Sequence, residues 1–311
     1  MAVVKCLLEH GADVNIGLPI VSAVKRRWYE AALLMLEYCK EIVDKEKHED
    51  AMFLAIADGR MDVAKRLAGF LPKTESSMKK AEEFLRQLAL NGNVIAIQRL
   101  IEMMNVDVNC KDQKNDTPLF YAMDGGKLDA AMYLIKHGAD IKVLGSGDET
   151  LLHCAAMEDL EFVKYLVEHG LDVNAKNKAG VTPLHHAVCC GQIDIAAYLL
   201  EHGADIHVTA TDGKPLVYCA SLKGTEEMLK FLVERGLDFK AKTKDGFTPM
   251  HAAVAVNPAI IPYLRSIGFP ELSEEDVKKA KNKYYSSLHL HDAFTIGCGH
   301  FWNHGNIVYY M

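Results

Sequence analysis

The sequence predicts an all-α array in which one helix pair is repeated along the chain, because two markers return at the same period. The first marker closes the second helix of each unit and is found at 105–109, 138–142, 170–174, 203–207 and 236–240. These starts are separated by 33, 32, 33 and 33 residues. The second marker begins the first helix of each unit and keeps step with the first, at Thr117, Thr150, Thr182, Lys214 and Thr248.

Each regular unit has the residues that begin, pack and end two short helices. Thr182 is expected to be a helix N-cap, and Pro183 suits the first helical position, where its missing N–H costs nothing. Small residues such as Ala187 then let neighbouring helices approach closely. The second helix carries apolar residues at helical spacing, as at 162–167. A glycine such as Gly203 closes it, because the left-handed conformation is easiest for glycine.

The connections between units carry Asp-Gly steps at 212–213 and 245–246, which indicate tight hairpin tips. With these elements in place, the segment from Thr182 to His207 resembles the ankyrin repeat family, and weaker copies stand on either side. The resemblance implies stacked helix-turn-helix pairs with projecting β-hairpin loops, which together form an elongated, curved solenoid. It also implies that protein binding is the activity to expect.

The upstream units depart from this pattern. Residues 1–15 resemble only the second half of a repeat, so either the array begins abruptly or the chain is part of a longer one. Helix pairs are expected in three further places: 18–38, 52–71 and 84–104. Two charged segments are expected to replace regular hairpins by longer, partly helical connections: 40–50 and 72–82. With the later units, this makes eight helix pairs after the N-terminal half-unit.

We therefore divide the chain into a partial repeat (1–15), divergent repeats (16–104), regular repeats (105–269) and a C-terminal region (270–311). In that last region, Ser273 and the three acidic residues after it form a good helix start. The apolar residues of this helix share one face, namely Val277, Ala280, Tyr284 and Leu288. We expect the helix to cap the last repeat and an aromatic tail to follow it.

Composition and charge narrow the functional classes. Half of the residues are hydrophobic and a quarter are charged, which is typical of a folded soluble protein. The net charge of -7 supplies no basic field for nucleic acid. No apolar run is long enough to span a membrane, and the N-terminus lacks the apolar core of a secretory signal. The eight cysteines show no disulfide spacing, so we expect reduced thiols and a cytoplasmic protein, with the nucleus or a host cell's cytoplasm as alternatives.

Three histidines return once per unit at one position of the first helix: His153, His185 and His251. Recurrence argues against catalysis, because an active site is needed once. In the ankyrin family this histidine is a structural hydrogen-bonding residue, and we expect the same role here.

The residues expected to contact a partner lie in the hairpin tips and at the exposed ends of the first helices, which line the concave face in the ankyrin family. The tips offer Gln113, Lys114, Asp116, Ser146, Glu149, Lys178, Val181, Lys214, Asp245 and Phe247. The first helices offer Asp124, Met157, Glu158, Cys189, Cys190, Ser221 and Leu222. The apolar members are the most telling, since apolar side chains on a groove suggest a partner, unless they pack between repeats.

Two further patterns are open to more than one interpretation. The basic and aromatic cluster at 25–29 is either a solvated turn or a contact for an acidic peptide or phosphate. Asn15, Asn109 and Asn174 each end a DVN segment. Such asparagines serve as turn residues, although in the ankyrin family a 2-oxoglutarate oxygenase hydroxylates some of them.

The tail holds one constellation that does not repeat: His289, His291, Asp292, Cys298, His300 and His304. Cys298, His300 and His304 with His291 could bind zinc, and Cys298 with a histidine could form a thiolate nucleophile, but neither spacing matches a specific rule. We therefore predict no metal site and no catalytic residue, and assign the tail to aromatic packing on the last repeat.

The sequence thus predicts a non-enzymatic scaffold or adaptor that binds a protein partner through its concave groove. No cofactor, nucleic acid, membrane insertion or small-molecule substrate is expected, and the chain is expected to be monomeric. Alternatives are a targeting module of a larger protein, a host-directed effector, or a ubiquitin-ligase substrate adaptor that recruits through its C-terminal tail.

Overall fold

The computed structural model describes residues 1–211 and 213–289, of which 285–289 by their backbone alone. It divides into two compact units, residues 1–140 (unit 1) and residues 141–311 (unit 2). Asp212, from the first Asp-Gly step, lies outside the described residues. The aromatic tail after residue 289 does so too, and with it all of the tail's Cys/His constellation except His289, which is described by its backbone alone.

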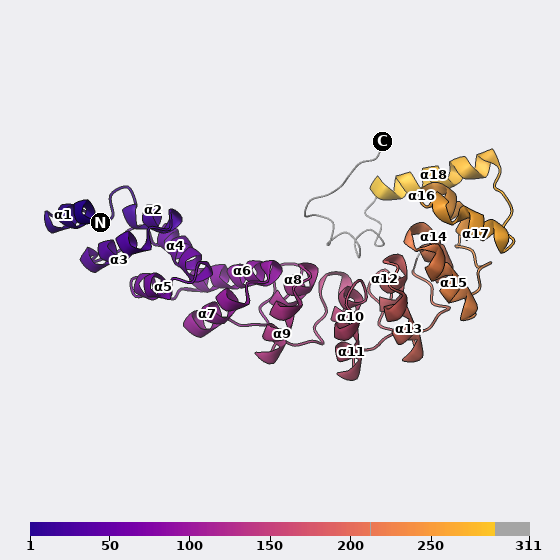
Figure 1. The fold of residues 1–311 in the computed structure, drawn as a ribbon, viewed down its shortest axis with the longest axis horizontal. Coiled ribbons are helices and arrows are strands. Elements are labelled where there is room, and N and C mark those ends of the chain that lie inside the picture. The colour runs from indigo at the N-terminus through magenta and orange to yellow at the C-terminus, as the bar shows by residue number, and fades with distance from the viewer. Residues whose placement is uncertain (212, 290–311) are drawn as a thin grey trace. The chain divides into compact units, whose positions relative to one another are not determined.

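Unit 1 consists of one lone helix followed by four helix pairs (Figure 1). The lone helix α1 spans Ala2–Glu9. The pairs are α2 (Pro19–Lys25) with α3 (Tyr29–Tyr38), α4 (Lys45–Ala57) with α5 (Met61–Ala68), α6 (Glu75–Asn91) with α7 (Val94–Met104), and α8 (Pro118–Asp124) with α9 (Leu128–Lys136).

Unit 2 contains four more pairs and a final helix. The pairs are α10 (Leu151–Ala155) with α11 (Leu160–Glu168), α12 (Pro183–Cys189) with α13 (Ile193–Glu201), α14 (Leu216–Lys223) with α15 (Glu226–Glu234), and α16 (Pro249–Val256) with α17 (Ile261–Ser266). Short 3-10 turns precede α10 (η1, Ser146–Asp148) and α17 (η2, Pro258–Ile260). The eight expected pairs are therefore all present in the described part of the chain.

Within each unit the helices form two layers. In unit 2 the first helices α10, α12, α14 and α16 pack side by side in one row, while the second helices lie in a row beneath them (Figure 1). Small residues make the close approach in the first row, since Ala155, Ala187 and Ala220 are completely buried. The second helices turn one apolar stripe inward, such as Phe162, Val163 and Leu166 of α11.

Two helices of unit 1 begin earlier than expected. Helix α4 starts at Lys45 because the Asp44 carboxylate accepts a hydrogen bond from the Lys47 N–H at 3.1 Å. Helix α6 starts at Glu75 because the Thr74 hydroxyl accepts one from the Ser77 N–H at 3.1 Å. Side-chain caps of this kind satisfy N–H groups that have no partner within the helix. The charged connections at 40–50 and 72–82 are therefore partly helical, as expected.

The recurring histidines are structural, as predicted. In His153 the Nδ1 atom accepts a hydrogen bond from the Thr150 N–H at 3.2 Å, and Nε2 lies 3.0 Å from the Val181 carbonyl oxygen in the next repeat. An Nδ1 that accepts requires the proton on Nε2, so Nε2–H donates to Val181. His185 and His251 make the same contacts to Thr182 and Thr248.

The asparagines of the DVN segments also form hydrogen bonds between neighbouring repeats. Asn174 Nδ2 donates to the Gly203 carbonyl at 2.8 Å, and its Oδ1 accepts from the Asp205 N–H at 2.8 Å. Asn109 makes the same pair of bonds to Gly138 and Asp140, at 2.9 and 2.8 Å. Each side chain therefore connects the end of one second helix to the end of the next.

The helix after Ser273 is present as α18 (Glu274–His289) and packs against α16, the first helix of the last pair. The Ser273 Oγ accepts from the Asp276 N–H at 3.1 Å, which caps the helix, and Ala280 is buried. Within the described residues, no helix combines the length and the apolar character that crossing a bilayer requires.

The expected β-hairpins are not formed as paired strands. Within residues 1–211 and 213–289 there is no strand, and one isolated bridge joins Thr209 to Pro215. The loops instead close through short-range backbone hydrogen bonds, such as those from the Asn177 N–H to the Val181 carbonyl at 3.0 Å and from the Gly180 N–H to the Asn177 carbonyl at 2.8 Å.

Candidate partner-binding surface

The loops between the regular helix pairs share one closed shape. In each, the backbone N–H of the first residue donates to the carbonyl of the fifth. The pairs are Asp112 with Asp116, Gly145 with Glu149, Asn177 with Val181, Ala210 with Lys214, and Thr243 with Phe247, at 2.9 to 3.1 Å. The first residues are again 32 or 33 positions apart, so the loops repeat as regularly as the helices do.

In three of these loops the side chain at the first position accepts hydrogen bonds from the loop backbone. This role was not predicted from the sequence. Asp112 Oδ1 accepts from the N–H groups of Lys114 and Asp116, both at 2.8 Å. Asn177 Oδ1 accepts from Ala179 and Val181 in the same way. Thr243 Oγ1 accepts from Phe247 at 3.0 Å. The signal was available, because Asp, Asn and Thr stand five residues before a Thr-Pro step in each case.

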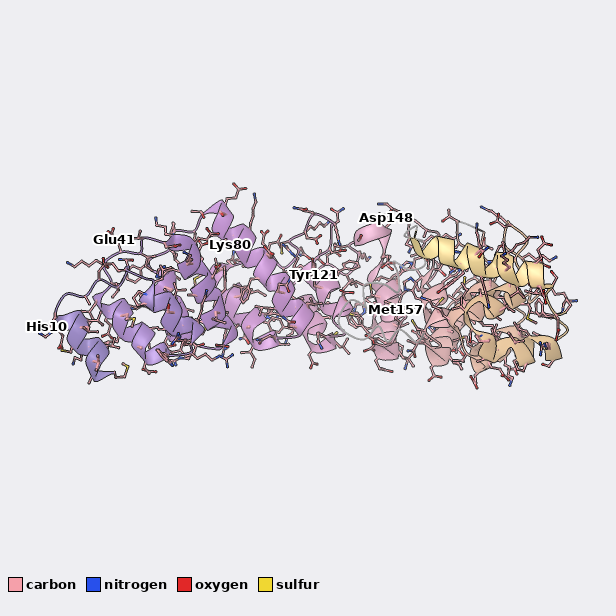
Figure 2. The ribbon with its side chains drawn as sticks, turned by 90° about the horizontal axis from the view of Figure 1, so that it is seen from above. His10, Glu41, Lys80, Tyr121, Asp148 and Met157 are labelled. Atoms are coloured by element: carbon pink, nitrogen blue, oxygen red, sulfur yellow. The ribbon has the colours of Figure 1, made fainter. Side chains whose placement is uncertain are left out.

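Asp112 has a second partner in Tyr121 of α8, whose hydroxyl donates to Oδ2 at 2.9 Å. Burial, followed by this hydrogen bond, raises the pKa of Tyr121 to about 12. Burial also raises the pKa of Asp112, but the hydrogen-bond donors around its carboxylate outweigh burial, so the pKa of Asp112 is lowered overall. Tyr121, labelled in Figure 2, therefore anchors its loop to the first helix of the pair.

In unit 2 the loops are also bonded to one another. The Lys178 N–H donates to the Gly147 carbonyl at 2.8 Å, and the Thr211 N–H donates to Ala179 at 2.9 Å. The Lys244 ammonium donates to the Thr211 carbonyl at 2.8 Å. We call the loops 145–149, 177–181, 210–214 and 243–247 the tip ladder. Asp148, labelled in Figure 2, belongs to it and pairs with Lys178 at 3.3 Å.

The expected contact residues fall into three groups by exposure. Six are exposed: Gln113, Lys114, Glu158, Lys178, Cys190 and Asp245. Seven are half-buried: Asp116, Asp124, Ser146, Glu149, Lys214, Leu222 and Phe247. Gln113, Lys114, Asp116 and Asp124 belong to unit 1, and the others belong to unit 2.

The remaining four are buried, so we remove them from the expected surface: Met157, Val181, Cys189 and Ser221. The Val181 carbonyl receives the His153 hydrogen bond, and the Val181 side chain is buried. Ser221 Oγ donates to the Val217 carbonyl one turn earlier at 2.8 Å. Met157, labelled in Figure 2, accepts from Gln192 through its carbonyl at 2.8 Å. A period of 33 residues locates a position in the repeat but does not say which way its side chain points.

A buried polar cluster lies directly beneath the tip ladder. The rings of His153 and His186 meet edge to face at 5.5 Å between centroids, and Nε2 of His186 lies 3.9 Å from a Glu149 oxygen. Burial lowers the pKa of His153 to about 4 and that of His186 well below its ordinary value. Both rings are therefore neutral at physiological pH, and both are part of the packed interior.

In the basic and aromatic cluster of unit 1, two side chains contact the next helix pair of the same unit. Arg27 pairs with Asp58 at 3.0 Å, and the Tyr29 hydroxyl donates to the same carboxylate. Burial, and then this hydrogen bond, raises the pKa of Tyr29 to about 12. Arg26 lies over the ring of Trp28, at 5.3 Å from the centroid. Asp58 thus connects the turn of the first pair to the turn of the second.

Comparison with known proteins identifies the repeats independently. A family described as ankyrin repeats (3 copies) matches residues 67–145, 85–177 and 144–210, and ankyrin repeats (many copies) matches 191–233. Human Inversin is 35% identical over 98 residues, which are 31% of this chain and 9% of that protein. Ankyrin repeat and KH domain-containing protein mask-1 of Caenorhabditis elegans is 28% identical over 145 residues, 45% of this chain and 5% of that protein.

Ankyrin repeat family A protein 2 of Bos taurus is 35% identical over 71 residues, which are 23% of this chain and 22% of that protein. The matches thus span less than a quarter of the length of each of these three relatives. The similarity concerns the repeated scaffold and not the remainder of those larger proteins.

Proposed function

Because this chain belongs to the ankyrin repeat family, it is a protein-protein interaction module, and we propose that unit 2 binds its partner through the tip ladder and the exposed ends of the first helices. The observation that supports this proposal is the bonding between loops. Loops that are fixed to one another lose little conformational entropy when a partner binds, so more of the contact energy remains as affinity.

The side chains available on this surface suit a folded protein or an extended segment of one. Lys178, Glu158 and Asp245 are exposed and provide a polar rim of both charges. Phe247 and Leu222 are half-buried and provide apolar contacts between them. Interfaces commonly combine a few apolar or aromatic anchors with a polar rim of this kind.

We further propose that the chain is a non-enzymatic, monomeric adaptor that acts in the cytoplasm without a cofactor. The family consists generally of interaction domains. The net charge of -7 favours a protein partner over nucleic acid. Capture of partners from the native cell tests the adaptor role, because it identifies the proteins that the chain binds.

The proposal is tested by capture with the full chain, followed by quantitative mass spectrometry. A double variant, Glu158→Lys with Lys178→Glu, reverses two charges on the proposed surface and leaves the net charge unchanged. We expect at least one partner to be depleted by about tenfold, because charge reversal at a rim costs roughly 1 kcal/mol or less per pair and adds repulsion.

The matched control is Glu234→Lys with Arg235→Glu, which makes the same exchange on exposed residues at the end of α15, a second helix. Partners should be retained by this control. Equal retention by both variants, or equal loss from both, would contradict the proposed surface. Melting temperatures of both variants establish that each is folded.

A further inference from the structure

A pocket of about 410 Å³ lies on the second helices of unit 1, between α5 and α7. Its volume is at the low end of the range for ligand sites, which fits a few side chains rather than a folded domain. The pocket is lined by second helices, whereas the expected contact residues of unit 1 lie in a loop and in the first helix α8. It is therefore a surface separate from the one proposed above.

Three apolar side chains line the pocket, namely Met61 from α5 with Ile95 and Met103 from α7. Ile95 is 59% exposed, although an isoleucine would gain from burial. Methionine adapts to differently shaped partners because its side chain is flexible and polarisable. The pocket thus offers apolar side chains beside polar ones, and solvent covers them in the isolated chain.

The pocket also holds two cations that no acidic side chain neutralises. Lys65 and Arg99 line it, and neither makes an ion pair within the described part of the chain. Two other cations of unit 1 do pair with carboxylates of a neighbouring helix pair, namely Arg60 with Glu30 and Lys80 with Glu46. The excess of positive charge is local to the pocket, because the chain as a whole has 42 acidic and 35 basic residues.

The Arg99 side chain lies against the turn of the neighbouring helix pair. Its Nη1 would lie 2.7 Å from a Cβ atom on Gly59, so the missing side chain at the α4–α5 turn leaves room for the guanidinium. The one carboxylate in the lining, Glu102, accepts a hydrogen bond from Gln98 at 2.8 Å. Two cations against one carboxylate leave the lining with a net positive charge.

From this juxtaposition we propose that the α5–α7 pocket binds a protein segment that carries an apolar anchor side chain next to carboxylates. The anchor displaces water from Met61, Ile95 and Met103, and the carboxylates pair with Lys65 and Arg99. An arginine can bind a carboxylate through two parallel hydrogen bonds, which adds orientation to the charge attraction. The chain then has a second contact surface, independent of the tip ladder.

The test uses the full chain labelled with carbon-13 at its methionine methyl groups, of which there are 13. The probe is a capped peptide with two leucines flanked by glutamates, and the same peptide with lysines in place of the glutamates is the control. We expect saturable shifts of the Met61 and Met103 signals with the first peptide alone, while Met228 and Met250 of unit 2 stay in place. Met61→Leu and Met103→Leu variants assign the two signals.

Charge variants then test the cations. Lys65→Gln and Arg99→Gln should each raise the apparent Kd about threefold, and the double variant about tenfold. Arg66→Gln, an exposed neighbour on α5 outside the lining, should leave it unchanged. Shifts that are absent up to about 1 mM peptide, equal with the lysine peptide, or unaffected by the double variant would overturn the proposal. None of these outcomes bears on the tip ladder, which lies in unit 2.

Discussion

At the scale of single residues, Asn174 shows how one side chain connects two neighbouring repeats of unit 2. Its amide makes both hydrogen bonds to the end of the next second helix, to Gly203 and Asp205. Asn174→Ala removes the acceptor and the donor together, so we expect a loss of about 1 to 3 kcal/mol in the free energy of unfolding. Urea denaturation measures it. Lys176→Ala, an exposed change in the same loop, should cost less than about 0.5 kcal/mol. An equal effect of the two variants would contradict this role of Asn174.

The buried histidines make stability depend on pH. His153 has a pKa of about 4 in the folded chain and 6.5 as its ordinary value, because burial disfavours the charged ring. Between these values the unfolded chain binds a proton that the folded chain does not. The stabilisation is therefore complete above about pH 6.5 and is lost progressively as pH falls towards 4. The free energy of unfolding should be about 2 kcal/mol lower at about pH 5 than at about pH 7.5 because of this residue alone.

His153→Gln tests this assignment, because glutamine does not titrate over this range. The variant is expected to be less stable at neutral pH but to lose less stability on acidification than the parent chain does. His169→Gln, at an exposed position in the same repeat, is the control. If His153→Gln keeps the full pH dependence, the titration belongs to other groups.

At the scale of elements, the tip ladder depends on backbone contacts between loops. Gly180 has a φ of +70°, and a Cβ atom there would lie 2.8 Å from the Thr211 nitrogen, which donates to Ala179. Gly180→Ala should therefore break the contact and lower the free energy of unfolding by about 2 to 3 kcal/mol. Gly203→Ala is the control, since φ there is also positive, at +90°, but the space is open, and about 1 kcal/mol is expected.

Thermal unfolding and exchange of the Thr211 amide measure the two glycine variants. Faster exchange at Thr211 in Gly180→Ala but not in Gly203→Ala is expected. Equal destabilisation by both would mean that the ladder adds nothing beyond backbone conformation.

The helix pairs themselves could be predicted from the sequence because their signals are local. A Thr-Pro step caps a helix, and a glycine ends one, whatever lies around it. The burial of Val181 and Ser221 could not be predicted, since it depends on how neighbouring repeats pack around each side chain. The α5–α7 pocket was missed for the same reason, because two helices that are separate in sequence supply its lining. For the segments in which α4 and α6 begin, the sequence predicts partly helical connections but not the residues at which the two helices start.

At the scale of the whole molecule, a chain built of repeats draws its stability from contacts between neighbours. Helix α18 packs on α16, with Ala280 buried in the contact. Ala280→Lys should therefore raise amide exchange in α16 and α18 and leave α4 to α8 of unit 1 unchanged. Asn282→Lys adds the same charge at an exposed position of α18 and should change neither region. Loss of protection in unit 1 would show that the stack unfolds as one cooperative body.

The central claim is that the tip ladder of unit 2 receives the protein partner. Hydrogen exchange of the full chain, with and without a partner captured from the native cell, tests it most directly. The account predicts slower exchange in the loops 145–149, 177–181, 210–214 and 243–247 and at the exposed ends of the first helices. Protection confined to the second helices α11, α13 and α15, with exchange in the loops unchanged, would contradict it.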